Sequence, residues 1–279
     1  MANESSIFSG GSSGAPSTRQ IKEAMSMQHT GNTLLITGGG AGIGRELAQR
    51  FNDLGNTVII TGRRMEPLNE TIAGRNNMHA LVLDVDDPAA INAFAKQIVA
   101  DYPELNVLVN NAGIMRYEDL SKTRDLGDAE AQITTNLLGP IRLTNALIDH
   151  LKSRPNPVVI NLSSGLGFVP RADAGTYGAT KAGIHSYTLS LRRQLQGQVK
   201  VIEIVPPAVQ TELTPGQSSR DGYMPLDDFI DEVMANFLRQ PVPDEILVQR
   251  VAFLRWAERE DRYEQTFETL NAHVAAAAR

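Results

Sequence analysis

Short apolar runs alternate with longer segments of helical periodicity along most of the chain. From Asn32 onward, runs of about five residues rich in Val, Ile and Leu have the composition of strands buried on both faces. We expect strands at 33–37, 57–61, 80–83, 107–110, 158–162 and 199–205. Strands this apolar, separated by helices, predict an α/β fold: a doubly wound (Rossmann) parallel sheet with helices on both faces.

The segments between these runs carry helix signals. Leu47, Phe51 and Leu54 fall on one helical face, and Gly55 suits the position after a helix end. Pro88 suits the first position of another helix. We also expect long helices over about 128–151 and 175–196.

The pattern also predicts the domain boundaries. Residues 1 to about 20 are rich in Ser and Gly, and we expect a flexible tail over 1–28. One Rossmann domain is expected over 29–262, with a substrate loop or lid at about 211–225 and helices at 226–262. We expect 263–279 to be a C-terminal tail that frays.

Composition narrows the classes of function. The formal net charge of -6 and the pI of about 5.4 give no reason to expect nucleic acid or an anionic membrane as partner. The absence of cysteine excludes disulfides, Cys-ligated zinc and a thiol nucleophile. The five histidines are scattered, so no metal site is predicted. The N-terminus lacks the features of a signal peptide and no apolar run is long enough for a membrane span, so we expect a cytoplasmic protein.

A glycine-rich segment, 38–44, follows the first predicted strand and precedes a helix. Glycines let the backbone approach a diphosphate closely, and the helix N-terminus offers N–H groups and a positive dipole end. A tight turn alone can require glycines, but the strand and helix around this segment favour dinucleotide binding. The expected cofactor-binding residues here are Gly38, Gly40, Gly42, Ile43 and Gly44.

The end of the second strand points to the type of dinucleotide. Folds that prefer NAD place an acidic residue there to hold the ribose 2′-hydroxyl, whereas this chain has Arg63 and Arg64. Guanidinium groups match phosphate geometry, so we expect a 2′-phosphate and therefore NADP(H). A solvated basic turn is the alternative.

Three further residues suggest proton transfer. Tyr177 and Lys181 lie four positions apart on a predicted helix, which places both side chains on one face. An ammonium beside the phenol should lower the tyrosine pKa, so that the phenol can give or take a proton. Ser163 and Ser164 end the fifth strand, at the edge where α/β sheets bind ligands.

Taken in order, these residues resemble the short-chain dehydrogenase/reductase family. Thr37-Gly38-x-x-x-Gly42-x-Gly44 matches the family's cofactor loop, Asn110-Asn111-Ala112-Gly113 its Asn-Asn-Ala-Gly signature, and Tyr177-Gly178-Ala179-Thr180-Lys181 its Tyr-x-x-x-Lys. Order and spacing agree from about Asn32 to Thr211.

The resemblance implies a role for each matching residue. Tyr177 would be the acid/base group, and Lys181 would hold the nicotinamide ribose and lower the tyrosine pKa. The family's serine lies thirteen positions before the tyrosine, which selects Ser164 over Ser163, and Asn136 resembles the asparagine that supports a water in the proton relay. The implied cofactor contacts are Asp84 and Val85 near the adenine, Asn111, Ala112 and Gly113 along the cleft, and Val209 and Thr211 near the nicotinamide.

The implied reaction is reversible hydride transfer between NADP(H) and a carbonyl or alcohol of a small, apolar molecule, an aldehyde or ketone in the reducing direction. An NAD-preferring dehydrogenase and a dinucleotide-sensing protein without turnover are the alternatives. The resemblance also implies a homodimer or homotetramer formed through the helices after the fourth and fifth strands. Pro207 departs from the family, which usually has Pro-Gly after the sixth strand. Arg116 and Tyr117 either reach the substrate pocket or lie in a surface loop.

Overall fold

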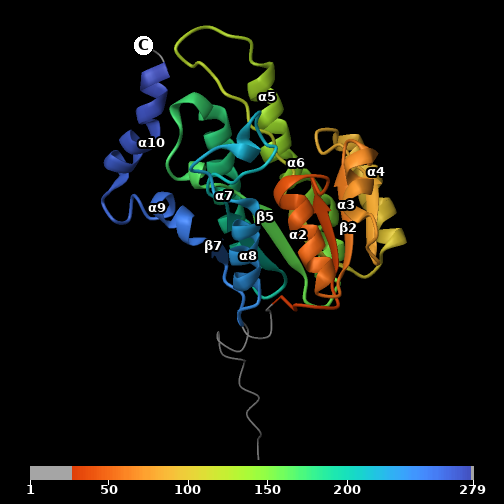
Figure 1. The fold of residues 1–279 in the computed structure, drawn as a ribbon. Coiled ribbons are helices and arrows are strands. Elements are labelled where there is room, and N and C mark those ends of the chain that lie inside the picture. Colours follow the sequence, from red (N-terminus) through yellow and green to blue (C-terminus); the bar gives the residue numbers. More distant parts are fainter. Residues whose placement is uncertain (1–26, 278–279) are drawn as a thin grey trace, which may run out of the picture.

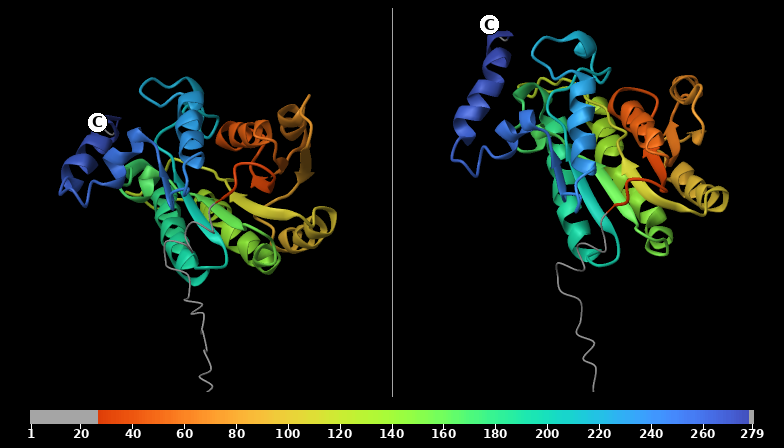
Figure 2. Two further views of the ribbon diagram at one scale, coloured as in Figure 1. Left: turned by 90° about the horizontal axis from the view of Figure 1, so that it is seen from below. Right: turned by 60° about the horizontal axis from the view of Figure 1, so that its bottom comes forward.

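The computed structural model describes residues 27–277, with side chains described for 27–272. Within them, a seven-stranded parallel sheet runs in the order β3-β2-β1-β4-β5-β6-β7 and is covered by helices on both faces (Figures 1 and 2). The strands are β1 (Thr33–Thr37), β2 (Thr57–Gly62), β3 (Met78–Val82), β4 (Leu105–Asn110), β5 (Val158–Leu162), β6 (Lys200–Val205) and β7 (Glu245–Leu247). The predicted doubly wound α/β fold is confirmed.

Alternate residues of each strand face opposite layers of helices. In β1, Leu34 and Ile36 pack into one core and Leu35 into the other. The first core is covered by α2 (Gly42–Asp53), α3 (Met65–Ile72) and α8 (Leu226–Phe237). The second is covered by α4 (Pro88–Asp101), α6 (Gly139–Lys152) and the C-terminal end of α7 (Gly175–Gln194).

The remaining helices lie around the carboxyl edge and the β7 end of the sheet. A short helix, α5 (Gly127–Ile133), passes through a π-helical turn at Thr134–Leu138 into α6. The chain ends with α9 (Ala252–Arg255) and α10 (Tyr263–Ala277), which lie to one side of the sheet (Figure 1). No helix among residues 27–277 is both long and apolar enough to cross a bilayer.

Two helix boundaries follow the predicted signals. Pro88 is the first residue of α4, and the Asp87 carboxylate caps that helix by accepting from the N–H groups of Ala89 (2.7 Å) and Ala90 (3.1 Å). Gly55 follows the end of α2 with a φ of 84°, a conformation that favours glycine.

The structure corrects the expected C-terminal organisation. Residues 226–262 are not all helical, because Glu245–Leu247 forms the edge strand β7 beside β6. Residues 263–277 form the helix α10, where a frayed tail was expected. Asn271 explains its docking: the side chain accepts from the N–H of Ala172 at 2.7 Å and donates to the carbonyl of Pro170 at 3.1 Å.

The expected N-terminal tail ends earlier than residue 28. Met27 is buried in the first core, and the carbonyl of Gln28 accepts from the Asn32 side chain at 2.9 Å. These two residues therefore belong to the folded part of the chain. The rest of the expected tail, 1–26, lies outside the described residues.

Candidate active site

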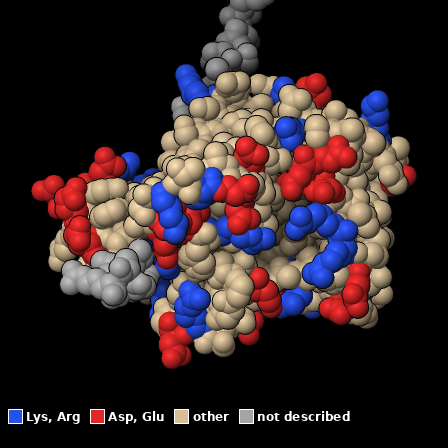
Figure 3. Space-filling model, turned by 90° about the horizontal axis from the view of Figure 1, so that it is seen from above, with Lys and Arg blue, Asp and Glu red and all other residues tan. Residues whose placement is uncertain are grey.

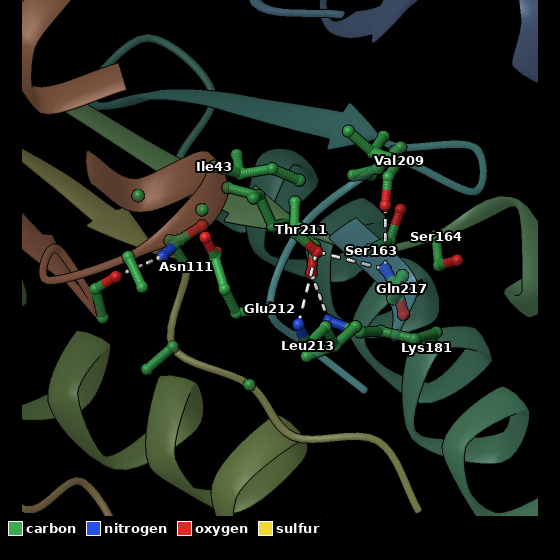
Figure 4. Close-up of a pocket in the computed structure, with 18 of the residues that line it drawn as sticks. Ile43, Asn111, Ser163, Ser164, Lys181, Val209, Thr211, Glu212, Leu213 and Gln217 are labelled. Carbon is green, nitrogen blue, oxygen red and sulfur yellow. Dashed lines mark hydrogen bonds between the residues drawn. The ribbon is translucent and has the colours of Figure 1, made fainter. Parts of the chain in front are cut away.

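A cleft opens at the carboxyl edge of the sheet, between β1 and β4. These strands are neighbours in the sheet, but the chain leaves β1 toward β2 and returns to β4 on the other side, so the helices that follow them cover opposite faces. A cavity of about 240 Å³ occupies this cleft (Figure 4). From above, Lys and Arg side chains surround a hollow on this face of the molecule (Figure 3). Most of the expected site residues line the cavity: Gly38, Gly42, Ile43, Gly44, Asn111, Ala112, Gly113, Ser164, Tyr177, Lys181, Val209 and Thr211.

The glycine loop has no room for side chains. Gly38 has a φ of 68°, and a Cβ there would lie 2.9 Å from the Cα of Ala112. A Cβ at Gly44 would lie 2.3 Å from the carbonyl oxygen of Gly38. No side chain caps the first turn of α2. The loop therefore brings bare backbone and a helix N-terminus to the cleft, which is the arrangement that a diphosphate requires.

Hydrogen bonds join the glycine loop to the segment after β4. The Thr37 hydroxyl accepts from the N–H groups of Asn111 (3.1 Å) and Ala112 (3.0 Å). In return, the Asn111 amide donates to the carbonyls of Thr37 (2.8 Å) and Gly38 (3.2 Å). Two motifs that are more than seventy residues apart thus form one wall of the cleft.

Ser164, Tyr177 and Lys181 come together at the other wall. Ser164 follows β5, while Tyr177 and Lys181 lie on the first turns of α7, and all three are buried. The Lys181 ammonium lies 5.6 Å from the centroid of the Tyr177 ring and donates to the carbonyl of Leu162 at 2.9 Å. Gly167 lets the segment after Ser164 pack closely against α7, because a Cβ there would lie 2.8 Å from the backbone of Lys181.

Burial shifts the pKa values of the two titratable groups in opposite directions. Loss of hydration raises the pKa of Tyr177 to about 12, and a hydrogen bond with Ser164 acts against this shift. Burial lowers the pKa of Lys181 to about 8, and the nearby Glu203 carboxylate acts against it. The expected lowering of the tyrosine pKa by Lys181 is therefore not found, because desolvation of the phenol dominates.

Asn136 lies in the π-helical turn between α5 and α6 rather than in the cavity wall. Its side-chain oxygen accepts from the N–H of Ile114, and its amide donates to the carbonyl of the same residue, both at 2.8 Å. The amide also donates to the Thr180 hydroxyl at 3.2 Å. Asn136 thus joins the segment after Gly113 to α7, beside Lys181.

The residues expected near the adenosine part of the cofactor lie outside the cavity wall. Arg63 and Arg64 are exposed, just after β2, and neither forms an ion pair with a residue in 27–272. The end of β2 is tied to the glycine loop, because the N–H of Gly39 donates to the carbonyl of Thr61 at 3.0 Å. Asp84 and Val85 lie just after β3, the strand that pairs with β2. Gly40 packs toward Pro67 of α3.

Comparisons with known proteins give the family. A model of short-chain dehydrogenases matches residues 32–222, more than half of the chain. The chain belongs to the short-chain dehydrogenase family. It is 40% identical over 249 residues to the "Uncharacterized oxidoreductase DltE" of Bacillus subtilis (strain 168), covering 88% of this chain and 98% of that protein.

Two other relatives show the range of this likeness. The "NADP-dependent 3-hydroxy acid dehydrogenase YdfG" of Escherichia coli (strain K12) is 35% identical over 178 residues, covering 63% of this chain and 72% of that protein. A short-chain dehydrogenase from Burkholderia cenocepacia J2315, solved in complex with NADP, shares the fold with a TM-score of 0.74 at 23% identity, over 87% of this chain and 98% of that one. The chain is thus an oxidoreductase of the short-chain dehydrogenase type.

Pro207, the departure from the family pattern, lines the cleft. The carbonyl of the preceding Pro206 accepts from the N–H of Gly165 at 2.9 Å, which holds this turn against the segment that carries Ser164. Farther along, the segment around Val209 pairs with Met224. The N–H of Met224 donates to the carbonyl of Ala208 at 2.9 Å, and the N–H of Gln210 donates to the carbonyl of Met224 at 2.8 Å. The expected loop of 211–225 is therefore closed at its base.

Sequence reasoning missed the residue that holds this loop over the cleft. The Gln217 amide donates to the carbonyl of Val209 at 2.8 Å and to the Thr211 hydroxyl at 3.1 Å (Figure 4). Its side-chain oxygen accepts from the Thr214 hydroxyl at 2.8 Å. A glutamine in a polar loop gives no sequence signal, because its partners are backbone groups and hydroxyls placed by the fold.

Glu118 is a second residue that the sequence did not single out. Its side chain is 1% exposed, and its carboxylate accepts from the N–H (2.6 Å) and the hydroxyl (2.7 Å) of Thr176 at the start of α7. It also pairs with Arg124. Glu118 therefore fixes the first turn of α7, the turn that carries Tyr177.

One group of residues in the described part of the chain has metal-ligand geometry. Ligand atoms of His185, Glu203 and Glu245 lie within 4.8 Å of one another. Each already has a protein partner: His185 Nδ1 bonds Glu203 at 2.8 Å, and Arg255 binds Glu245 through two nitrogens at 2.9 and 3.0 Å. The group is a network of hydrogen bonds and one Arg–Glu ion pair near Lys181, and we assign no metal to it.

Proposed function

We propose that this protein is an NADP(H)-dependent oxidoreductase that interconverts a carbonyl and an alcohol, with Tyr177 as the acid/base. The observation that supports this most strongly is the juxtaposition of buried Ser164, Tyr177 and Lys181 with the glycine loop in one cleft. The residues present fit a dinucleotide, since the loop leaves bare backbone beside an uncapped helix N-terminus. When bound, the nicotinamide supplies or accepts the hydride.

In the reducing direction, Tyr177 donates its phenolic proton to the carbonyl oxygen while the carbonyl carbon gains the hydride. The high pKa keeps this phenol protonated at neutral pH, so the proton is available for transfer. Ser164 holds the same oxygen by a hydrogen bond. Lys181 binds the ribose beside the nicotinamide, and Asn136 positions the segment at Gly113 and completes the route by which Tyr177 regains a proton.

The preference for NADP(H) rests on Arg63 and Arg64. Two exposed guanidinium groups without ion-pair partners in residues 27–272 follow β2, where a ribose 2′-phosphate would lie. The similarity to an NADP-dependent enzyme of Escherichia coli agrees with this assignment. Asp84, Val85 and Asn111 to Gly113 would contact the adenine and the cleft side of the cofactor, and Val209 and Thr211 its nicotinamide end.

A tyrosine substitution tests the proposed chemistry. We expect Tyr177→Phe to lose about 100-fold or more of the NADPH-dependent reduction of aldehydes and ketones, because it removes the proton donor. Binding of NADPH, followed by fluorescence titration, should remain. Tyr187→Phe is the matched control: it lies on the same helix, outside the cavity wall, and should keep full turnover. Equal loss in both variants would contradict the assignment of Tyr177.

The two arginines test the proposed cofactor preference. Replacing Arg63 and Arg64 by Ala should raise the Kd for NADPH at least about 10-fold, because charge-assisted bonds to a phosphate contribute roughly 1.5–3 kcal/mol. The Kd for NADH should change little. An equal loss for both cofactors, or for neither, would show that the arginines do not bind a 2′-phosphate.

A further inference from the structure

A second cavity adjoins the cleft and shares part of its wall. It measures about 470 Å³, and Ser164, Tyr177 and Pro207 line both cavities. A molecule in the second cavity can therefore present a carbonyl to Ser164 and Tyr177. Much of its remaining wall is apolar, formed by Met115, Leu166, Leu213, Phe253, Leu254 and Leu270.

Two arginines interrupt this apolar wall. Arg171 precedes the turn that leads into α7, and Arg220 lies in the loop over the cleft. Both guanidinium groups donate to the hydroxyl of Tyr223, at 3.4 and 3.2 Å respectively. Arg220 also donates to the hydroxyl of Tyr117 at 3.2 Å, and Arg171 lies over the Tyr117 ring. The fold thus gathers two cations and two phenols from three separate segments.

The charges in this cluster do not cancel. Asp173 binds Arg171 through two nitrogens, at 2.9 and 2.7 Å. Arg220 forms no ion pair with any carboxylate in residues 27–272; its side-chain partners there are the hydroxyls and the ring of its two tyrosines. Among residues 27–272, the half-exposed Arg220 is thus a cation in the wall of a mostly apolar cavity without a carboxylate partner.

This arrangement suits an oxyanion. A guanidinium offers several N–H groups in a fixed plane that matches a carboxylate or a sulfonate. Tyr223 bridges the two arginines, so its hydroxyl adds a neutral hydrogen-bonding group beside them. An uncharged substrate would leave the charge of Arg220 unused.

We propose that the substrate carries a carboxylate or sulfonate, which Arg220 and its tyrosine and arginine neighbours bind, while its carbonyl lies at Ser164 and Tyr177. The carbon chain of the substrate, which links its anionic group to its carbonyl or extends beyond them, packs against the apolar wall. This assignment rests on the proposed function, and it adds an anionic end to the small, apolar molecule that the sequence suggested.

The test compares oxo acids and aldehyde acids of graded chain length with their methyl esters, in NADPH-dependent reduction by the wild type and by Arg220→Met. The wild type should reduce the best acid with a kcat/KM at least about 10-fold above that of its ester, a preference equivalent to about 1.4 kcal/mol. Arg220→Met should lower kcat/KM for the acid by a similar factor, mainly through KM, and leave the ester within about threefold.

Two further variants separate charge from loop structure. Arg220→Lys keeps a cation and should retain part of the preference for the acid. Arg239→Met removes an exposed arginine outside the cavity wall, and it should leave kcat/KM unchanged for both the acid and the ester. Equal use of acid and ester by the wild type, or equal loss of both in Arg220→Met, would overturn the anion site and leave the proposed function standing. If no carbonyl compound in the panel supports NADPH oxidation, the proposed function fails and the anion site with it.

Discussion

Burial of Lys181 disfavours the charged form of its amine. Its pKa is lowered to about 8 in the folded protein, against about 10.4 in an unfolded chain. Below pH 8 both states hold the proton, and the full desolvation cost is present. Between about pH 8 and 10.4 the folded state releases the proton first, so the free energy of unfolding rises with pH from this group.

The comparison of wild type with Lys181→Met measures this effect. The wild type should gain about 1.4 kcal/mol of stability per pH unit relative to the variant above pH 8, or about 2 kcal/mol by pH 9.5. Tyr177 does not disturb this window, because both proteins contain it and its pKa is raised. Urea denaturation at pH 7 to 9.5 provides the measurement. A difference that stays constant across this range would contradict the lowered pKa.

At the residue scale, spacing within one helix was predictable and contacts between loops were not. Tyr177 and Lys181 could be paired from their four-residue separation, and Ser164 from the strand before it. Arg171 and Arg220 could not be paired, because they are 49 residues apart and meet through two tyrosines, Tyr117 and Tyr223. Of the two open candidates after Gly113, Tyr117 touches the arginine cluster, whereas Arg116 pairs with Asp128 at 3.7 Å.

At the element scale, α7 depends on its first turn. The buried carboxylate of Glu118 accepts from the N–H and the hydroxyl of Thr176, and it also pairs with Arg124. Other bonds tie the middle of the helix to β5, since the Asn161 amide donates to the Thr188 hydroxyl at 2.9 Å. Glu118 therefore determines how accurately Tyr177 is placed.

Removal of Glu118 should affect both stability and turnover. We expect Glu118→Ala to lower the free energy of unfolding by about 2 kcal/mol, because it leaves a part-buried N–H and a mostly buried arginine without their partner. Turnover should fall as well, since Tyr177 is the next residue after Thr176. Urea denaturation and NADPH oxidation give the two readings. Glu130→Ala on α5, which is exposed, should change neither; a similar effect in both variants would contradict the role of Glu118.

Elements with strong apolar periodicity were predictable, and those without it were not. Strand β7 has three residues, too few for an alternating pattern. Helix α10 has a weak apolar face, and buried polar residues, Thr266 and Asn271, hold part of it in place. The long helix predicted at 128–151 is present, but its π-helical turn depends on the bonds of Asn136 to Ile114 and Thr180.

At the scale of the whole molecule, α5 and α7 share a surface of exposed small and apolar side chains. Exposed Ala179, Ala182, Ser186 and Leu189 recur at helical spacing along α7, and α5, which contacts α7, exposes Ile133. The expected homodimer or homotetramer would use this face, because these helices follow the fourth and fifth strands. The strand order of the sheet, in contrast, could not be predicted beyond the doubly wound class.

Light scattering coupled to size exclusion tests the expected assembly. The wild type should elute with the mass of a dimer or tetramer, and Leu189→Glu should shift it toward a smaller species, because a charge would be buried in the contact. Leu238→Glu changes an equally exposed leucine at the end of α8 and should leave the mass unchanged. A monomeric wild type would exclude this interface.

The measurement that tests the central claim most directly follows the hydride itself. The protein would be incubated with NADPH that carries deuterium at the transferred position of the nicotinamide, together with the panel of oxo acids, ketones and aldehydes, and the alcohol products analysed by mass spectrometry. We predict one deuterium on the carbinol carbon of the product formed by the wild type, and at least about 100-fold less product from Tyr177→Phe. A wild type that forms no deuterated alcohol, or a Tyr177→Phe variant that forms as much as the wild type, would contradict the account.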